Sequence, residues 1–388
     1  MLSANELVDW YASRGISLSL QTGQDGAPDL PEESPFTYSI WQEGEETCIS
    51  AGSTYDWCAA LDAIMREDGL NRLPLYHIAV PQTPSLACRE QAPGAVRVMF
   101  YNHHGQLAGL CGPVDWCEQL QTELASVYRP DVLALQEFTP WRSAKPGCLG
   151  DRLRAIGYTQ VNGGYADNFT PLFYRADTLE LIDSGFHLYS EYMNDQNQPD
   201  PQGAYKINNG KSKSLTWAVF EQRSGGKRFI AVSTHFMYIA DPTDPECPLT
   251  AEQAEAAQLI DTAELLAVIG ELRARPGYSG LPVIAGGDLN AFPDSAPVQA
   301  LQAGGLTWLS APGAAETLIE NSPCGYPTFD VEKGYYTAFG QKLNRPEQII
   351  DHAFVQGDLT VLDYITITDR SACYSSDHCP KFADFILN

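Results

Sequence analysis

AGGDLNAFPDS, residues 285–295, follows directly on the apolar run LPVI and ends it with an aspartate and an asparagine two residues apart. Asp288 and Asn290 stand between two glycines and a proline, and two interpretations compete. In one, they are turn residues whose side chains bond to their own backbone. In the other, a buried strand brings a carboxylate and an amide to the edge of a site. Gly-Asp-x-Asn is common in turns, so the rest of the chain has to decide.

The same arrangement recurs along the chain, because several strand-like runs end on polar residues. VRVMFYN ends on an asparagine, DVLALQE on a glutamate and FIAVSTH on a histidine, while QII leads into an aspartate and YSSDH ends on an aspartate–histidine pair. Each residue alone fits a solvated strand end or a structural histidine, since strand ends are where polar groups reach water. Only the set is informative, and it comprises Asn102, Glu137, His235, Asp288, Asn290, Asp351, Asp377 and His378.

Oxygen donors dominate this set, and they suit a hard cation. Mg²⁺ binds oxygen ligands at about 2.0–2.1 Å and keeps several waters, so one or two carboxylates and an amide suffice. Phosphate-ester hydrolysis uses such groups: a cation against the phosphoryl oxygens, a base that aligns water, and donors for the developing charge. The chain has no G-x-S-x-G elbow and no H-E-x-x-H, and NNGKSKS, residues 208–214, lacks the earlier glycine of a Walker A motif. The sequence therefore favours metal-assisted hydrolysis of a phosphate ester.

Strand-like and helical patterns alternate through the second part of the chain. A helix is predicted before Pro130, and its apolar stripe comprises Trp116, Leu120, Leu124 and Val127. A longer helix is predicted between a capping box, formed by Thr250 and Gln253, and Pro276. Its apolar residues include Leu259, Ala263, Leu266 and Ile269. Helices mixed with strands that look like antiparallel hairpins predict an α/β protein with sheets packed on each other and helices outside.

The ordered motifs YN, LQE, STH, GDLN, IDH and SDH closely resemble those of the endonuclease/exonuclease/phosphatase superfamily, which has the DNase I-like fold. Each motif is short, whereas their order and spacing together are specific, and the resemblance covers about residues 95–388. It implies a four-layer α/β sandwich with two central mixed β-sheets flanked by helices, and an active site at one edge. The sequence places a small α+β segment in front of this domain.

The resemblance also implies roles for the polar residues of the first strands. Glu137 corresponds to the principal metal-binding glutamate of the superfamily, and Asn102 lies beside it, touching metal or phosphate. Asp288 corresponds to the aspartate that aligns or deprotonates the attacking water. Asn290 corresponds to the amide that holds a phosphate oxygen.

The remaining roles concern charge on the phosphoryl group. His235 and His378 correspond to the two histidines that stabilise pentacovalent phosphorus, and Asp351 to the carboxylate that fixes the tautomer of the second and keeps it cationic. Asp377 corresponds to a position that contributes to the metal shell in many relatives. The implied cofactor is Mg²⁺, with Mn²⁺ as the alternative.

Three positions need separate interpretation. Some nuclease members have an acidic residue where this chain has His104, so a second metal-ligand contribution is not expected, and His104 is interpreted as a loop residue. Lys213 is the nearest match to a basic residue, usually arginine, that precedes the strand leading to the first histidine. It is predicted to contact the substrate phosphate as a point charge. His352, beside Asp351, is interpreted as a packed structural residue.

The balance of charge restricts the substrate. Lys and Arg number 24 against 49 Asp and Glu, which gives a formal net charge of −25. Such a field repels polyanions and anionic lipid surfaces, and no basic strip of the kind found in duplex-DNA enzymes is apparent. We therefore favour a small or modest-sized phosphodiester or phosphomonoester, held by the metal and by the lysines at 206, 211 and 213. A metal-dependent DNA or RNA nuclease is the alternative, and a non-catalytic binding protein on the same fold is the second.

Residues 1–93 are expected to form a small α+β accessory or docking domain of unknown function, a possible site for a protein partner. Ser3 and Glu6 form a capping-box pattern, strand-like and helical runs follow, and PQTPSLACREQAPGA, residues 81–95, has the composition of a linker. Residues 94–388 are expected to be the catalytic domain.

The remaining sequence features concern compartment. The ten cysteines include no C-x-x-C pair and are interpreted as mostly reduced core residues. No apolar run approaches the length of a membrane span, and the first residues lack a signal-peptide pattern. We expect a cytoplasmic protein without membrane insertion.

Overall fold

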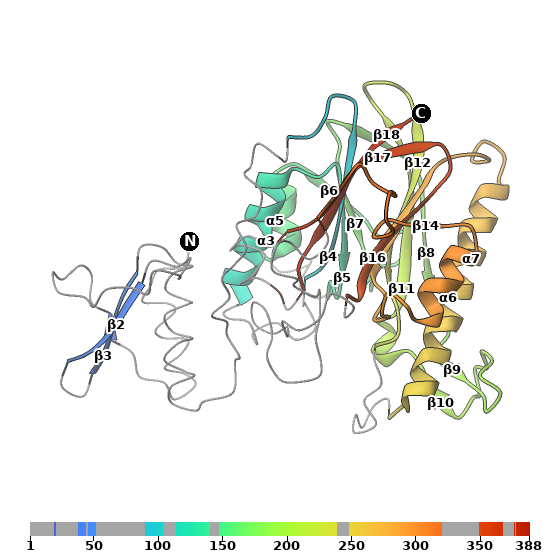
Figure 1. Ribbon diagram of the computed structural model, residues 1–388, viewed down its shortest axis with the longest axis horizontal. Helices are drawn as coiled ribbons and strands as arrows, with labels where there is room; N and C mark the ends of the chain where they lie inside the picture. Colours follow the sequence, from blue (N-terminus) through green and yellow to red (C-terminus); the bar gives the residue numbers. More distant parts are fainter. Residues whose placement is uncertain are drawn as a thin grey trace.

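Two β-sheets packed face to face form the centre of the molecule (Figure 1). The fold is given by a computed structural model, which describes residues 90–103, 114–139, 147–238, 248–319, 349–367, 376 and 378–388, together with the backbone of the strands β1 (Ser19–Leu20), β2 (Tyr38–Glu43) and β3 (Glu46–Ala51). These three strands form a small sheet of their own. The helices predicted within residues 1–93 lie outside the described residues.

The first large sheet has seven strands in the order β15-β17-β18-β4-β5-β7-β6. Its strands are β4 (Val96–Asn102), β5 (Val132–Gln136), β6 (Tyr158–Val161), β7 (Leu172–Arg175), β15 (Thr317–Ile319), β17 (Leu359–Thr366) and β18 (Lys381–Leu387). β4 and β5 are parallel, whereas β18 and β7 pair antiparallel with them. The sheet is therefore mixed.

The second sheet has six strands in the order β14-β16-β13-β12-β11-β8. Its strands are β8 (Leu179–Leu188), β11 (Ser214–Gln222), β12 (Arg228–His235), β13 (Val283–Asp288), β14 (Thr307–Trp308) and β16 (Asp351–Gln356). β12 and β13 are parallel, and the neighbours on either side are antiparallel. A short hairpin of β9 (Tyr192–Met193) and β10 (Tyr205–Lys206) leaves this sheet after β8.

Alternation along the strands builds the core between the sheets. In β4, Val96, Val98 and Phe100 face the opposite sheet, while Met99 and Tyr101 face the helices. The inner residues of the second sheet are small or apolar and include Ala218, Phe220, Ala231, Ile284 and Ala353. Because side chains alternate with a period of two, the next inward position of β4 is Asn102. The register of the core thus aims this asparagine into the space between the sheets.

Helices cover both outer faces and complete the predicted four layers. α3 (Val114–Tyr128) and α5 (Leu149–Ala155) lie on the seven-stranded sheet, and α6 (Ala251–Ala274) and α7 (Ala296–Ala303) lie on the six-stranded sheet (Figure 1). The four-layer α/β sandwich with mixed sheets is therefore confirmed. One detail of α3 was predicted wrongly: Val127 is 46% exposed, and Tyr128, one residue later, packs on the sheet with Leu124. The residues of α3 that pack on the sheet are spaced i, i+4, and Tyr128 continues this spacing after Leu124.

α6 begins at the predicted capping box, in which the Thr250 hydroxyl accepts the Gln253 N–H and the Gln253 side chain accepts the Thr250 N–H. Its buried face is less apolar than the sequence pattern indicates, because Leu259 is 37% exposed whereas Gln258 and Asp261 are buried. Across the described ranges, no helix is both long enough and apolar enough to span a membrane.

Candidate active site

The candidate site lies where strands of both sheets end. Asn102 ends β4 and Glu137 follows β5 in one sheet, while His235 ends β12 and Asp288 ends β13 in the other. Parallel strands bring their carboxyl ends to the same edge, and the register pairs Asn102 with Gln136 and His235 with Asp288. Asp351, the first residue of the antiparallel β16, is opposite Asp288. Strand direction alone therefore gathers five of the predicted residues.

Asn102 connects the two sheets at this edge. Its amide nitrogen donates to Asp288 Oδ2 at 2.9 Å and to Glu137 Oε1 at 3.1 Å, and lies 3.4 Å from His378 Nε2. The side chain is fully buried. One amide group thus contacts three of the residues that the sequence predicts for the site.

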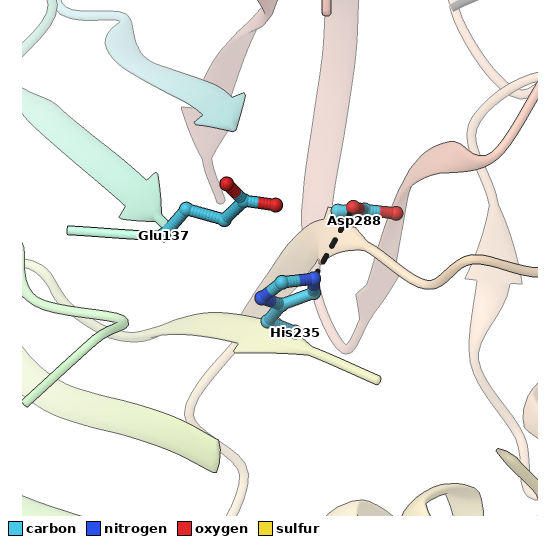
Figure 2. A group of neighbouring side chains, drawn as sticks. All are labelled: Glu137, His235 and Asp288. Carbon is cyan, nitrogen blue, oxygen red and sulfur yellow. Dashed lines mark ion pairs between the residues drawn. The ribbon is translucent and has the colours of Figure 1, made fainter. Parts of the chain in front are cut away.

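Asp288 uses its two carboxylate oxygens differently. Oδ1 accepts the N–H of Asn290 at 2.8 Å, which is the local turn bond expected of a turn aspartate. Oδ2 faces the site and lies 3.3 Å from His235 Nε2, the ion pair drawn in Figure 2. It lies 3.8 Å from His378 Nε2. The two interpretations of residues 285–295 therefore both hold, one for each oxygen.

The environment keeps Asp288 ionised. Burial raises the pKa of Asp288, but the positive charges of His378, His235 and Lys213 and the His235 hydrogen bond outweigh this effect. Together they hold the pKa of Asp288 well below its usual range. An ionised aspartate is an acceptor only. Asp288 is thus suited to accepting hydrogen bonds from water and from imidazole N–H groups.

His378 is held from two sides. Its Nδ1 lies 2.8 Å from Asp351 Oδ2, and its backbone N–H donates to the Ser376 hydroxyl at 3.1 Å. Ser376 in turn donates to the carbonyl of Asn102 at 2.7 Å. Ser376 is the first residue of the SDH motif, but no role was predicted for it, because a serine beside a polar pair is equally typical of a loop. The Asp351 contact leaves Nε2 as the atom that faces Asp288.

His235 has a different partner. Its Nε2 lies 2.7 Å from Lys213 Nζ, and Lys213 is itself buried. Burial and the Lys213 charge lower the pKa of His235, while Asp288 acts in the opposite direction. Its Nδ1 is buried and has no hydrogen-bond partner among the described residues. The two histidines are therefore not equivalent, since a carboxylate supports His378 and an ammonium group contacts His235.

Glu137 fits a cation ligand. It has a left-handed backbone conformation (φ 58°), which is uncommon outside glycine and turns the side chain out of the strand toward Asn102. Oε2 is buried without a hydrogen-bond partner in the described parts of the chain. One ligand atom from each of Glu137, His235 and Asp288 lies within 4.8 Å of the others, and so do atoms of Asp288, Asp351 and His378. A buried carboxylate oxygen with no donor beside it fits a divalent cation.

The remaining predicted residues are placed as follows. The Asn290 amide nitrogen donates to the Phe236 carbonyl at 3.1 Å, so in this conformation it anchors the loop. His352 is fully bonded, because Nδ1 accepts from Trp308 and Nε2 donates to the Ala291 carbonyl. This agrees with its interpretation as a structural residue. Asp377 and His104 lie outside the described residues.

Most of the chain matches a known family. The family model of the endonuclease/exonuclease/phosphatase family matches residues 99–378. The chain belongs to this family. Members of the endonuclease/exonuclease/phosphatase family generally hydrolyse phosphate esters and generally depend on divalent metal ions. Among curated proteins, none matches this sequence significantly.

Solved structures show that the fold is that of this family. An endonuclease/exonuclease/phosphatase from Bacteroides vulgatus is 20% identical, with a TM-score of 0.55, and the match covers 76% of this chain and 99% of that one. A mannosyl-6-phosphatase from Bacteroides thetaiotaomicron is 18% identical, with a TM-score of 0.52 and coverage of 75% and 100%. TDP2 from D. rerio, complexed with a single-strand DNA product, is 16% identical, with a TM-score of 0.51 and coverage of 75% and 98%. At these identities the likeness concerns the fold alone.

Proposed function

We propose that this protein is a divalent-metal-dependent phosphoesterase that hydrolyses a small or modest-sized phosphate ester by in-line attack of water. One observation supports this most directly: Asn102, Glu137, Asp288 and His378, from both sheets, contact one another around a single buried amide. Membership of a family of phosphate-ester hydrolases agrees with it.

Glu137 and Asn102 would hold the metal ion, which is Mg²⁺ or Mn²⁺, and Asp377 would complete its shell. The ion would supply positive charge to the phosphoryl oxygens. The buried Oε2 of Glu137, which has no partner among the described residues, supports this assignment. The Asn102 carboxamide orients the Glu137 carboxylate through the 3.1 Å bond to Oε1.

Asp288 would align the attacking water. Its pKa is held well below the usual range of an aspartate, so it is a weak base, and we assign it orientation of the water in preference to full proton removal before attack. We assign this role to Oδ2, which faces the site and accepts from Asn102 there, whereas Oδ1 is held in the turn by the Asn290 N–H. The turn bond thereby fixes which oxygen faces the substrate.

His378 and Lys213 would stabilise charge on the phosphoryl group. Asp351 holds His378 through Nδ1 and supports positive charge on the ring, so that Nε2–H is directed at the site. Lys213 is a buried ammonium group whose Nζ lies 2.7 Å from His235 Nε2, and the same nitrogen lies 3.3 Å from Asp288 Oδ2. Asn290 would turn its amide from Phe236 to a phosphate oxygen when substrate binds.

The charge of the chain favours a small substrate. A net charge of −25 opposes the approach of a polyanion, so a nuclease activity is the less favoured alternative.

We also propose residues 94–388 as the catalytic domain, residues 1–93 as a separate accessory domain that docks a protein partner, and the cytoplasm as the location. Full turnover by residues 94–388 expressed alone would support the domain boundary, and loss of turnover would oppose it.

The test is hydrolysis of bis-p-nitrophenyl phosphate and p-nitrophenyl phosphate, with Mg²⁺, with Mn²⁺ and with chelator. We expect metal-dependent release that Asp288→Ala reduces at least ~10²-fold. Asp294→Ala, which removes an exposed aspartate from the same segment, is the matched control and should leave the rate unchanged. The ratio of diester to monoester rates would identify the substrate class.

Other outcomes separate the alternatives. Turnover of oligonucleotides but of neither small ester would favour a nuclease. No turnover of any ester by the wild-type protein, with intact folding, would favour the non-catalytic binding protein.

A further inference from the structure

The layer directly beneath the candidate site is polar, although the rest of the space between the sheets is apolar. Along β5 the inward residues are Val132 and Ala134, and the next inward position is Gln136. Along β12 the inward residues are Phe229 and Ala231, and the next is Ser233. Gln136 and Ser233 are both fully buried. The inward-facing side chains of each strand thus change from apolar to polar just before the strand reaches its site residue.

Gln136 and Ser233 join the two sheets by hydrogen bonds, and we call this pair the inter-sheet bridge. Gln136 Nε2 donates to Ser233 Oγ at 3.0 Å and to the carbonyl of Ala134 at 3.1 Å. Ser233 Oγ donates onward to the carbonyl of Leu135 at 2.9 Å. The serine hydroxyl therefore accepts from the Gln136 side chain and donates to the Leu135 carbonyl, so two hydrogen bonds tie Ser233 of β12 to β5 in the other sheet.

Gly287 leaves the room for this bridge. A Cβ added at Gly287 would lie 2.0 Å from the Thr234 carbonyl oxygen and 2.9 Å from Gln136 Nε2, and the residue has φ 146°, which favours glycine. Gly287 directly precedes Asp288. The bridge therefore contacts β13 as well, next to the carboxylate of the site.

The bridge touches the chain beside the candidate residues of both sheets. Gln136 immediately precedes Glu137, and Ser233 lies two residues before His235 on the same face of β12. A second contact of the same kind follows along this edge, where the Thr170 and Ser214 hydroxyls lie 3.0 Å apart. The polar layer therefore continues beneath the segment that places Lys213.

We propose that Gln136 and Ser233 are positioning residues, which set the separation of the two sheets at this edge and so hold Glu137 at the distance from Asp288 and His235 that the metal ion requires. This inference rests on the proposed function. The bridge affects metal affinity through the backbone of Glu137 and does not contact the substrate.

The unsatisfied group of the bridge supports this role. Gln136 Oε1 is buried and has no partner among the described residues. A buried polar atom without a partner destabilises a protein, and apolar side chains of the same size would fill this space without that cost. Hydrogen bonds, unlike apolar contacts, fix direction and distance. The geometry of the site is the property that the polar pair provides.

The experiment measures Mn²⁺ binding by calorimetry and, separately, turnover of the responsive nitrophenyl ester. Ser233→Ala should weaken Mn²⁺ binding at least fivefold and lower kcat, with little change in KM. Tyr158→Phe is the control, because it removes a buried hydroxyl that donates to the carbonyl of Pro130 at 2.8 Å, at the opposite edge of the sheet. It should lower stability without altering Mn²⁺ affinity.

Two further variants complete the test. Gln136→Met keeps the volume and removes the bond, so it should reproduce the Mn²⁺ effect even if Ser233→Ala does not fold. The double variant should be no worse than the more affected single variant, because each removes the same bridge. Ser233→Thr, which keeps the hydroxyl, should restore affinity.

Unchanged Mn²⁺ affinity in folded Ser233→Ala or Gln136→Met, or an equal change in Tyr158→Phe, would overturn the inference while leaving the proposed function intact. If the wild-type protein itself bound no divalent metal ion, the proposed function would fail and the inference with it.

Discussion

Glu137 and His378 occupy one cluster but should fail in different ways when removed. Glu137→Ala removes the carboxylate whose Oε2 has no hydrogen-bond partner in the part of the chain that the structure describes, so we expect metal affinity to fall at least about tenfold. His378→Ala removes a group held by Asp351 and directed at Asp288, so it should spare metal binding and lower kcat about 10²–10⁴-fold. Calorimetry with Mn²⁺ and steady-state kinetics on the same preparations distinguish the two.

Metal binding by the Glu137→Ala variant tests the assignment of Glu137 to the metal site. Equal metal affinity in the wild type and Glu137→Ala would remove Glu137 from the metal site. Lys227→Ala is a suitable control for general damage, because Lys227 donates to the carbonyl of Leu387 at the far edge of the fold.

Asp261 gives a prediction on pH. It lies on α6 and is fully buried, with Oδ2 accepting the Met237 N–H at 2.7 Å and Oδ1 without a partner in the described ranges. Burial raises its pKa well above the usual range, against the effect of the Met237 bond. The native state therefore binds this proton more tightly than the unfolded chain, and the Asp261 contribution to the free energy of unfolding falls as pH rises above the unfolded pKa of about 3.9.

Asp261→Asn should remove this contribution. The variant should lose less stability than the wild type between about pH 4 and pH 7, by up to ~1.4 kcal/mol per pH unit in the part of that window below the native pKa of Asp261. Urea unfolding at a series of pH values measures the difference in slope. Parallel pH profiles for the two proteins would show that Asp261 is ionised in both states.

The gathering of the candidate residues at one edge could be predicted from the motifs taken as a set, because each residue lies at or beside a strand end and strand ends collect at one edge. What each side chain contacts could not be predicted. The 2.7 Å contact between Lys213 Nζ and His235 and the bond from the Asn290 amide to the Phe236 carbonyl are examples, and the expected contacts of both residues with substrate phosphate stay predictions. These partners depend on side-chain rotamers and on loops far apart in the chain, which residue spacing does not determine.

At the scale of elements, strands were predictable and helix faces were not. Central strands such as β4, β5 and β13 are buried on two sides and appear as continuous apolar runs, which end where the polar layer begins. The apolar pattern of α6 predicts the wrong inner face, because the inner face of this helix lies beneath the site loops. Gln258 donates to the carbonyls of Met237 and Asn290, and Thr262 donates to Gln258. A helix that supports a polar site buries polar residues, and its apolar pattern no longer marks its inner face.

The pairing of β4 with β18 supplies a prediction on stability. Arg97 on β4 forms two parallel bonds to Asp384 on β18, Nε to Oδ1 at 2.7 Å and Nη2 to Oδ2 at 2.6 Å, and both side chains are buried. Removing one partner leaves a buried charge, so Asp384→Ala should lower the free energy of unfolding by about 3–5 kcal/mol. Arg97→Met combined with Asp384→Leu should recover most of the loss.

Urea denaturation with tests of two-state behaviour measures both variants. A loss below about 1 kcal/mol for Asp384→Ala would mean that water reaches this pair as it does a surface ion pair. The ion pair joins residues 287 positions apart in the chain, and no local pattern in the sequence indicates it.

At the scale of the whole molecule, the net charge of −25 should oppose the approach of an anionic substrate. Salt screens this repulsion, since the Debye length falls from about 30 Å at 0.01 M to about 8 Å at 0.15 M ionic strength. The kcat/KM for bis-p-nitrophenyl phosphate should therefore rise roughly 2- to 10-fold over this range at saturating metal. An enzyme that attracts nucleic acid through a basic surface would show the opposite dependence.

A substrate without net charge separates the effect of the protein's electrostatic field on substrate approach from the other effects of salt on the enzyme. p-Nitrophenyl phosphorylcholine is a zwitterionic diester, so its kcat/KM should stay nearly constant while that of the anionic diester rises. A fall for the anionic diester alone would mean that cations at the mouth of the site outweigh the charge of the rest of the molecule. Because Lys213 is buried against His235, such cations would have to come from other residues, and the nuclease alternative would then become the favoured one.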